Sequence, residues 1–111
     1  MIYFENRNIS NGGVREMCIG VVGGIKGIEH EYKSMINEKG YKCKLFNQKV
    51  PDFDKKIKNT DCIIMLTGTV SHKLSCEVCK LCKKNNITLY RKHSSGANSI
   101  KEVLEDMGIV N

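Results

Sequence analysis

Apolar residues fall into four short runs that are typical of β-strands. The unbroken runs from Met17 to Val22 and from Cys62 to Leu66 predict strands buried on both faces. The segment from Tyr41 to Phe46 alternates with a period of two, which predicts a strand at the edge of a sheet. A fourth strand is predicted from Ile87 to Lys92.

Helical patterns separate these strands. An apolar stripe predicts a helix from about Ile28 to Lys39, Pro51 opens a short helix, and a third helix is predicted from about Ser71 to Asn85. Ser99 and Glu102 have the spacing of a capping box, which predicts the start of a fourth helix. Each predicted strand is thus followed by a helix.

This alternation predicts the fold class and the domain organisation. Short connections between strands and helices predict a parallel sheet with right-handed crossovers, and hence a three-layer, doubly wound α/β domain of the flavodoxin or Rossmann kind. We expect four strands in the order 2-1-3-4. One domain is predicted over residues 17–108. Residues 1–16 hold several Asn and Gly and are predicted to form an N-terminal arm or a short edge strand.

Composition indicates which kind of protein the chain is and where in the cell it is expected. A chain of 111 residues with 41% apolar and 27% charged residues is typical of one globular domain. No apolar run approaches the ~20 residues of a membrane span, and the first residues lack the pattern of a signal peptide. We therefore expect a cytoplasmic protein with no membrane partner.

The formal net charge of +6 favours anionic partners. A Lys-rich surface that only contacts water is the common alternative. Aromatic residues make up 6% of the chain and Trp is absent, so a base-stacking surface for nucleic acid is not expected. A small anionic molecule is the partner that the charge favours.

Six cysteines in a cytoplasmic chain are expected to be thiols, metal ligands or core residues before disulfides. Cys18, Cys43 and Cys62 each fall inside a predicted strand, where a small apolar side chain packs well. We interpret these three as core residues.

The other cysteines form a C-x-x-C-x-x-C run at Cys76, Cys79 and Cys82, which resembles part of an iron–sulfur ligand set. On a regular helix, successive members would be rotated by ~60° and would rise by ~4.5 Å. Three thiolates on an intact helix cannot converge on one cluster. A site that uses one or two of these thiols remains open.

Three loops are predicted to meet at the carboxyl edge of the sheet, at the switch point between the first and third strands. They run from Gly23 to Gly27, from Thr67 to Lys73 and from His93 to Ser95. Helix N-termini direct N–H donors to the same edge, so a phosphate-like or nucleotide-like ligand is expected there. The alternative is that these are exposed loop residues that cap helices. The candidate ligand-binding residues are Gly23, Gly24, Lys26, Thr67, Thr69, Ser71, His72, Lys73, Ser94 and Ser95.

His72 and His93 are predicted on this same edge, and His30 in the first turn of the first helix. Two or three imidazoles, with or without a thiolate, could hold zinc, iron or haem, so a metal or haem sensor is an alternative function. Local hydrogen bonding of each His is the simpler interpretation.

The chain lacks the residues that define several known classes of α/β protein. The glycines of the first loop do not form G-x-G-x-x-G, and no G-K-[ST] is present. The third strand ends in Thr67 and Gly68 instead of the Asp of a receiver domain, and Cys18 lies too early for a phosphocysteine carrier. Ser71 and His72 are neighbours without an identifiable acidic partner, so enzymatic activity is not expected.

The motifs GVVGGIKG, LTGTVSH and HSSGANSIKEVL resemble those of a family of small bacterial proteins catalogued as a domain of unknown function. The resemblance covers roughly Met17 to Leu104 and implies a Rossmann-like domain without an assigned activity. It places Arg or another residue at His93, which argues against a His–His metal site shared by the family. Cys76 and Cys79 are not part of its pattern. The positions that match the family are Gly23, Gly24, Lys26, Thr67, Ser71, His72, Ser94 and Ser95.

Three functions follow from these patterns. The first is a small ligand-binding or regulatory domain, and the second is a metal or haem sensor. The third is a structural module that forms a homo-oligomer, such as a dimer, through residues 1–16 or an edge strand, with no ligand.

Overall fold

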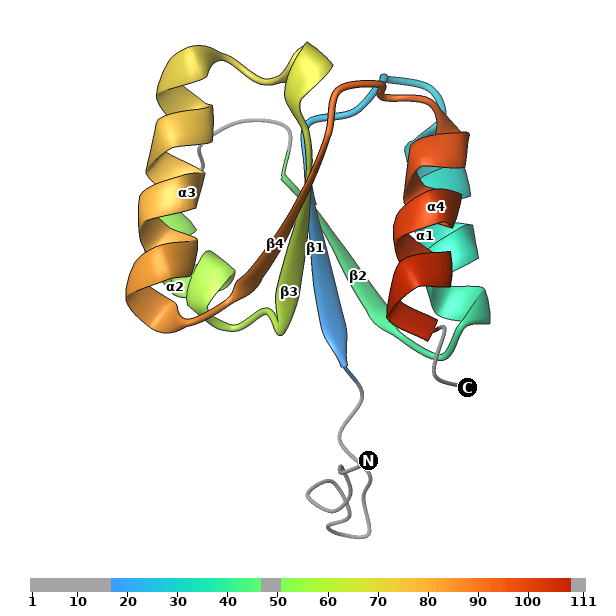
Figure 1. Cartoon of the computed structure of the whole chain (residues 1–111), viewed down its shortest axis with the longest axis horizontal. Helices are drawn as coiled ribbons and strands as arrows, with labels where there is room; N and C mark the ends of the chain where they lie inside the picture. The colour runs from blue at the N-terminus through green and yellow to red at the C-terminus, as the bar shows by residue number, and fades with distance from the viewer. Residues whose placement is uncertain (1–16, 47–50, 109–111) are drawn as a thin grey trace, which may run out of the picture.

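Four parallel strands form one sheet at the centre of the computed structural model, which describes residues 17–46 and 51–108 (Figure 1). The order is β2-β1-β3-β4. The predicted parallel sheet and its order are confirmed, as is the edge position of the second strand. The predicted N-terminal arm lies outside the described residues. The strands are β1 (Cys18–Val22), β2 (Lys42–Phe46), β3 (Cys62–Leu66) and β4 (Thr88–Lys92).

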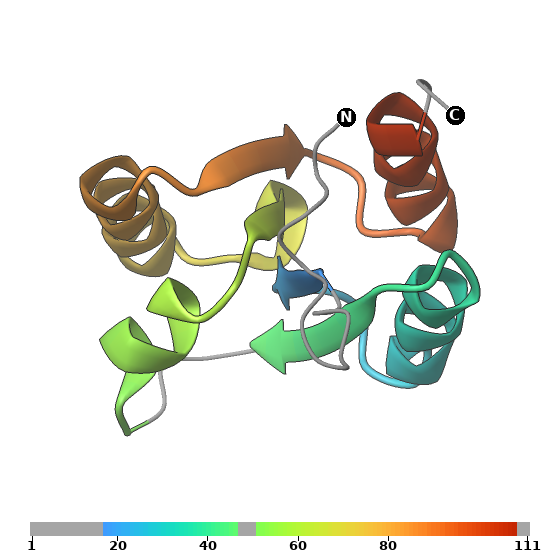
Figure 2. The same ribbon diagram turned by 90° about the horizontal axis from the view of Figure 1, so that it is seen from below.

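Helices cover both faces of the sheet, which confirms the three-layer prediction. α1 (Glu29–Glu38) and α4 (Ala97–Gly108) cover one face, and α2 (Phe53–Lys58) and α3 (His72–Asn85) cover the other (Figures 1 and 2). One turn of 3-10 helix, η2 (Thr67–Thr69), follows β3. Among the helices of the described segments, none combines the length and apolar character that crossing a bilayer requires.

The core has two halves, one on each side of the sheet. Val21 and Ile64 belong to the half that contains Tyr32 of α1, whereas Val22 and Ile63 belong to the half under α2 and α3. Every residue of β1 and β3 is buried. Burial on both faces explains why these two strands have unbroken apolar runs.

A serine cap sets the start of α3, whereas the cap predicted for the last helix is not formed. Ser71 precedes α3, and its hydroxyl oxygen accepts a hydrogen bond from the backbone N–H of Leu74 at 3.1 Å. The predicted capping box of the last helix is wrong, because α4 begins at Ala97 and Ser99 lies inside it. The Ser99 hydroxyl donates to the Ser94 carbonyl at 2.8 Å, and Glu102 pairs with Lys92 instead.

The strand cysteines are core residues, as predicted, although Cys43 on the edge strand is only half-buried. Cys62 is 1% exposed, and this burial, with the nearby charge of Asp61, raises the pKa of its thiol from 9.0 to about 12. Burial likewise raises the pKa of Cys82 to about 11. These thiols stay protonated in the folded protein at neutral pH.

The raised pKa of Cys62 predicts lower stability in alkali. Below pH 9.0 the thiol is protonated in both states, but between 9.0 and about 12 only the unfolded chain loses the proton. The free energy of unfolding should therefore fall by up to about 1.4 kcal/mol per pH unit in this window. Urea unfolding at pH 8 and pH 10 measures the slope. Cys62→Ala should show a shallower slope, and equal slopes would contradict the prediction.

Candidate functional site

The loops that follow β1, β3 and β4 meet at the carboxyl edge of the sheet, at the top of Figure 1. The backbone N–H of Gly24 donates to Thr69 Oγ1 at 2.7 Å. Thr69 Oγ1 also lies 2.9 Å from Ser95 Oγ. Three residues predicted for the site, from three different loops, are therefore in direct contact.

The hydroxyl of Thr69 is the centre of this contact. It has one hydrogen and can accept two hydrogen bonds. Its third neighbour is the Leu66 carbonyl at 3.0 Å, which can only accept. All three contacts are satisfied when Thr69 donates to Leu66 and accepts from Gly24 and from the Ser95 hydroxyl. Thr69 then uses its only hydroxyl hydrogen within the contact between the loops. The hydroxyl hydrogen of Ser95 can instead turn from Thr69 to another acceptor.

Tyr32 connects the loops after β1 and β4 from inside the core. The hydroxyl of this fully buried side chain accepts from the backbone N–H of Ile25 at 2.9 Å and donates to the Ser95 carbonyl. Tyr32 belongs to the apolar stripe that predicts the helix from about Ile28 to Lys39, and this pattern gives its hydroxyl no role. A buried tyrosine hydroxyl normally requires a polar partner, and that requirement was the available signal.

Gly68 allows the loop after β3 to lie against the end of β4. Its N–H donates to the His93 carbonyl at 3.0 Å. A Cβ at Gly68 would lie 2.5 Å from the same carbonyl oxygen, so no larger residue fits without moving backbone. Thr67 Oγ1 reaches the Lys92 carbonyl at 3.4 Å. The loops after β3 and β4 are thus held together.

The other predicted residues have varied surroundings. The Gly23 N–H donates to the Phe46 carbonyl at 2.9 Å, and Ser71 caps α3. Ser94 Oγ accepts from the Gly96 N–H at 3.3 Å. Lys26 and Lys73 are exposed. Three of these side chains, those of Ser94, Lys26 and Lys73, therefore leave polar hydrogens available at the surface.

Lysine supplies the formal charge of the three loops. The segments Gly23–Ile28, Thr67–Lys73 and His93–Asn98 contain two Lys, two His and no Asp or Glu, and the Glu29 carboxylate accepts from the Gly27 N–H at 3.4 Å next to the first loop. Lys92 is paired with Glu102 at 2.9 Å, so its charge is partly balanced. The first N–H groups of α3 have no acceptor within the helix and add positive potential.

The two histidines predicted as metal ligands each have a contact of another kind in the structure. His72 Nε2 lies 3.6 Å from Cys76 Sγ, and the His93 carbonyl accepts from Gly68. Within residues 17–46 and 51–108, no group of three or more His, Cys, Asp and Glu side chains is placed to hold a metal ion. A site shared by the two histidines, or a haem site, stays a prediction.

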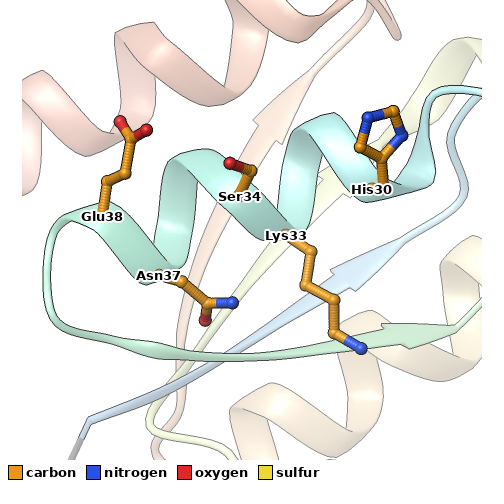
Figure 3. Close-up of a pocket in the computed structure, with 5 residues that line it drawn as sticks. All are labelled: His30, Lys33, Ser34, Asn37 and Glu38. Carbon is orange, nitrogen blue, oxygen red and sulfur yellow. The ribbon is translucent and has the colours of Figure 1, made fainter.

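Two surface depressions lie away from these loops. One, of about 430 Å³, is lined only by side chains of α1 (Figure 3). The other, of about 500 Å³, runs from Lys33 along β2 to Lys56. Neither includes a residue predicted to bind the anion, although His30, a candidate metal ligand, lines the one on α1. A ligand at the carboxyl edge would therefore rest on the joined loops. The depression on α1 is lined by His30, Lys33, Ser34, Asn37 and Glu38.

The fold and this edge define a doubly wound α/β domain with a cationic cluster of loops at its switch point. The chain belongs to the bacterial family described as "uncharacterized protein conserved in bacteria (DUF2325)", whose model matches residues 18–107. This match confirms the family resemblance. No curated protein matches the chain significantly.

A solved structure shares the fold. It is the lactose-specific IIB component domain of the phosphoenolpyruvate:carbohydrate phosphotransferase system from Streptococcus pneumoniae. The two are 16% identical with a TM-score of 0.54, and the match covers 82% of this chain and 97% of that one. At this identity the likeness is one of fold. It supports the flavodoxin-like or Rossmann-like assignment.

Proposed function

We propose that the protein is a small cytoplasmic ligand-binding or regulatory domain that binds a phosphate-bearing anion at the carboxyl edge of its sheet. The observation that carries the proposal is the meeting of three loops that contain no acidic residue. Lys26 and Lys73 belong to two of these loops and are exposed, and α3 begins within the loop segment after β3. In parallel α/β sheets, ligands bind at this place.

The proposed contacts follow from which hydrogens are available. The ammonium groups of Lys26 and Lys73 would supply charge, and the first N–H groups of α3 would donate to phosphate oxygens. Ser94 can donate its hydroxyl hydrogen while it still accepts from Gly96. Ser95 can turn its hydrogen from Thr69 towards a ligand, because Thr69 keeps its bonds to Gly24 and Leu66.

The name of the structural neighbour agrees with this ligand class, since that domain is part of a phosphotransferase system. The loop after β1 holds Gly23 and Gly24 and no cysteine, so we propose binding of a phosphate group without its covalent transfer. The domain then senses or carries its ligand.

The test is a titration of the full chain with inorganic phosphate and with adenosine 5′-phosphates at low salt. Binding is followed by amide chemical shifts and by thermal shift. We expect the amides of Gly24, Thr69 and Lys73 to move, and a ligand at a hundred times its dissociation constant to add ~2.7 kcal/mol of stability.

A matched pair of lysines on α3 provides the control. Lys73→Ala removes a charge at the first turn of the helix, and Lys84→Ala removes the same charge at its last turn. Each charge-assisted contact contributes about 1.5–3 kcal/mol, so Lys73→Ala should weaken binding roughly 10-fold to 100-fold. Equal effects of the two variants would show attraction to net charge only and would reject the site.

A further inference from the structure

The side chains of His72 and Cys76 form a pair on α3, and the proposed function uses neither side chain. They are one helical turn apart, and His72 Nε2 lies 3.6 Å from Cys76 Sγ. Both side chains are exposed. Imidazole nitrogen and thiolate sulfur are the two ligand types that zinc prefers.

The separation of the two atoms fits a shared metal ion. Zinc binds nitrogen at about 2.0–2.1 Å and sulfur at about 2.3 Å, and a tetrahedral angle between such bonds places the ligand atoms about 3.6 Å apart. The distance in the structure is 3.6 Å. The separation of the two atoms is therefore the one that a shared tetrahedral ion requires.

The helix holds the pair in this geometry. α3 runs without a break from His72 to Asn85, its start is capped by Ser71, and Leu74 and Val78 anchor its inner face. Residues four apart on a helix lie on the same face, so their side chains can chelate one ion. The alternative interpretation is a simple hydrogen bond between thiol and imidazole, which requires no metal.

We propose that His72 Nε2 and Cys76 Sγ form a two-ligand site for a borderline-soft divalent cation such as Zn²⁺. Binding exchanges the thiol proton for the metal, and that proton is released to solvent. The neutral imidazole uses the lone pair of Nε2. Because two of four tetrahedral positions are filled, the other two remain open to water or to an external ligand.

This site differs from a His72 and His93 site in its second ligand. His93 lies on the loop after β4, where its backbone is bound to Gly68, whereas Cys76 shares the helix with His72. The proposal does not rest on the anion site, because Cys76 contributes nothing to that site. The two can therefore fail separately.

The experiment is a titration of the reduced, chelator-treated full chain with Co²⁺ and then with Zn²⁺. Cobalt bound to a thiolate gives a charge-transfer band in the near ultraviolet, and competition with a chromophoric chelator gives the zinc affinity. We expect one thiolate per ion in the wild type. Cys76→Ser should abolish the band, and His72→Ala should weaken zinc binding by about tenfold or more.

Two control variants remove a thiol and an imidazole that lie outside the proposed site. Cys79→Ser removes a thiol three residues further along α3, and His93→Ala removes the other imidazole of the carboxyl edge. Both should keep the cobalt band and the zinc affinity. An unchanged band in Cys76→Ser, or its loss in Cys79→Ser, would overturn the assignment. Absence of binding in the wild type would leave only the thiol–imidazole hydrogen bond.

Discussion

Replacing Gly24 with Ala is expected to lower the free energy of unfolding by about 2–5 kcal/mol. Gly24 has a φ of +117°, which L side chains rarely adopt. A Cβ there would also lie 2.7 Å from Cε2 of Tyr32, whose ring is fully buried and cannot move aside. Backbone strain and steric overlap therefore add together. Urea unfolding of both proteins measures the difference.

Gly27→Ala is the matched control for this prediction. Gly27 has a φ of +99° in the same loop, but a Cβ at this position meets nothing within 4 Å. Gly27→Ala should lower the free energy of unfolding by the backbone strain alone, about 1–2 kcal/mol. The excess cost at Gly24 then reports the contact with Tyr32. If the two glycines cost the same, the ring does not lie beneath the loop.

Tyr32→Phe is expected to destabilise the domain by about 2–4 kcal/mol, because it leaves two polar groups without their partner. The hydroxyl binds the Ile25 N–H from the loop after β1 and the Ser95 carbonyl from the loop after β4. Phe fills the same apolar space, so no cavity contributes. Amide hydrogen exchange should also speed up at Ile25 relative to the sheet.

Tyr41→Phe separates this effect from the loss of any tyrosine hydroxyl. Tyr41 is half-buried, and its hydroxyl makes no hydrogen bond to another residue of the segments 17–46 and 51–108. Its substitution should change stability by less than about 0.5 kcal/mol. A cost for Tyr32→Phe as small as this would mean that its hydroxyl does not join the loops.

The central strands were predictable because a strand that is buried on both faces requires an unbroken run of apolar residues. β3 matches its prediction at both ends, and β1 and β4 begin one residue later than predicted. The start of α4 was not predictable from Ser99 and Glu102. A Ser three residues before a Glu fits a cap, but Ser99 bonds Ser94 from within the helix and Glu102 bonds Lys92. The first partner lies in the loop that leads into α4, and the second lies at the end of β4.

The position of the candidate site was predictable from topology, whereas its internal contacts were not. Parallel strands bring their carboxyl ends to one edge, so Gly24, Thr69 and Ser95 could be placed together from the order of elements. The partners of Tyr32 and His72 depend on side-chain direction. Tyr32 turns its hydroxyl towards two loops, and His72 turns along α3 to Cys76.

The most direct test of the account is whether the loops after β1, β3 and β4 touch in solution. Nuclear Overhauser contacts in the labelled full chain measure this. We expect cross-peaks from the Gly24 amide proton to the side chain of Thr69, and from Thr69 to the β-protons of Ser95. Fully assigned spectra that lack both sets, while the contacts between strands are present, would contradict the account.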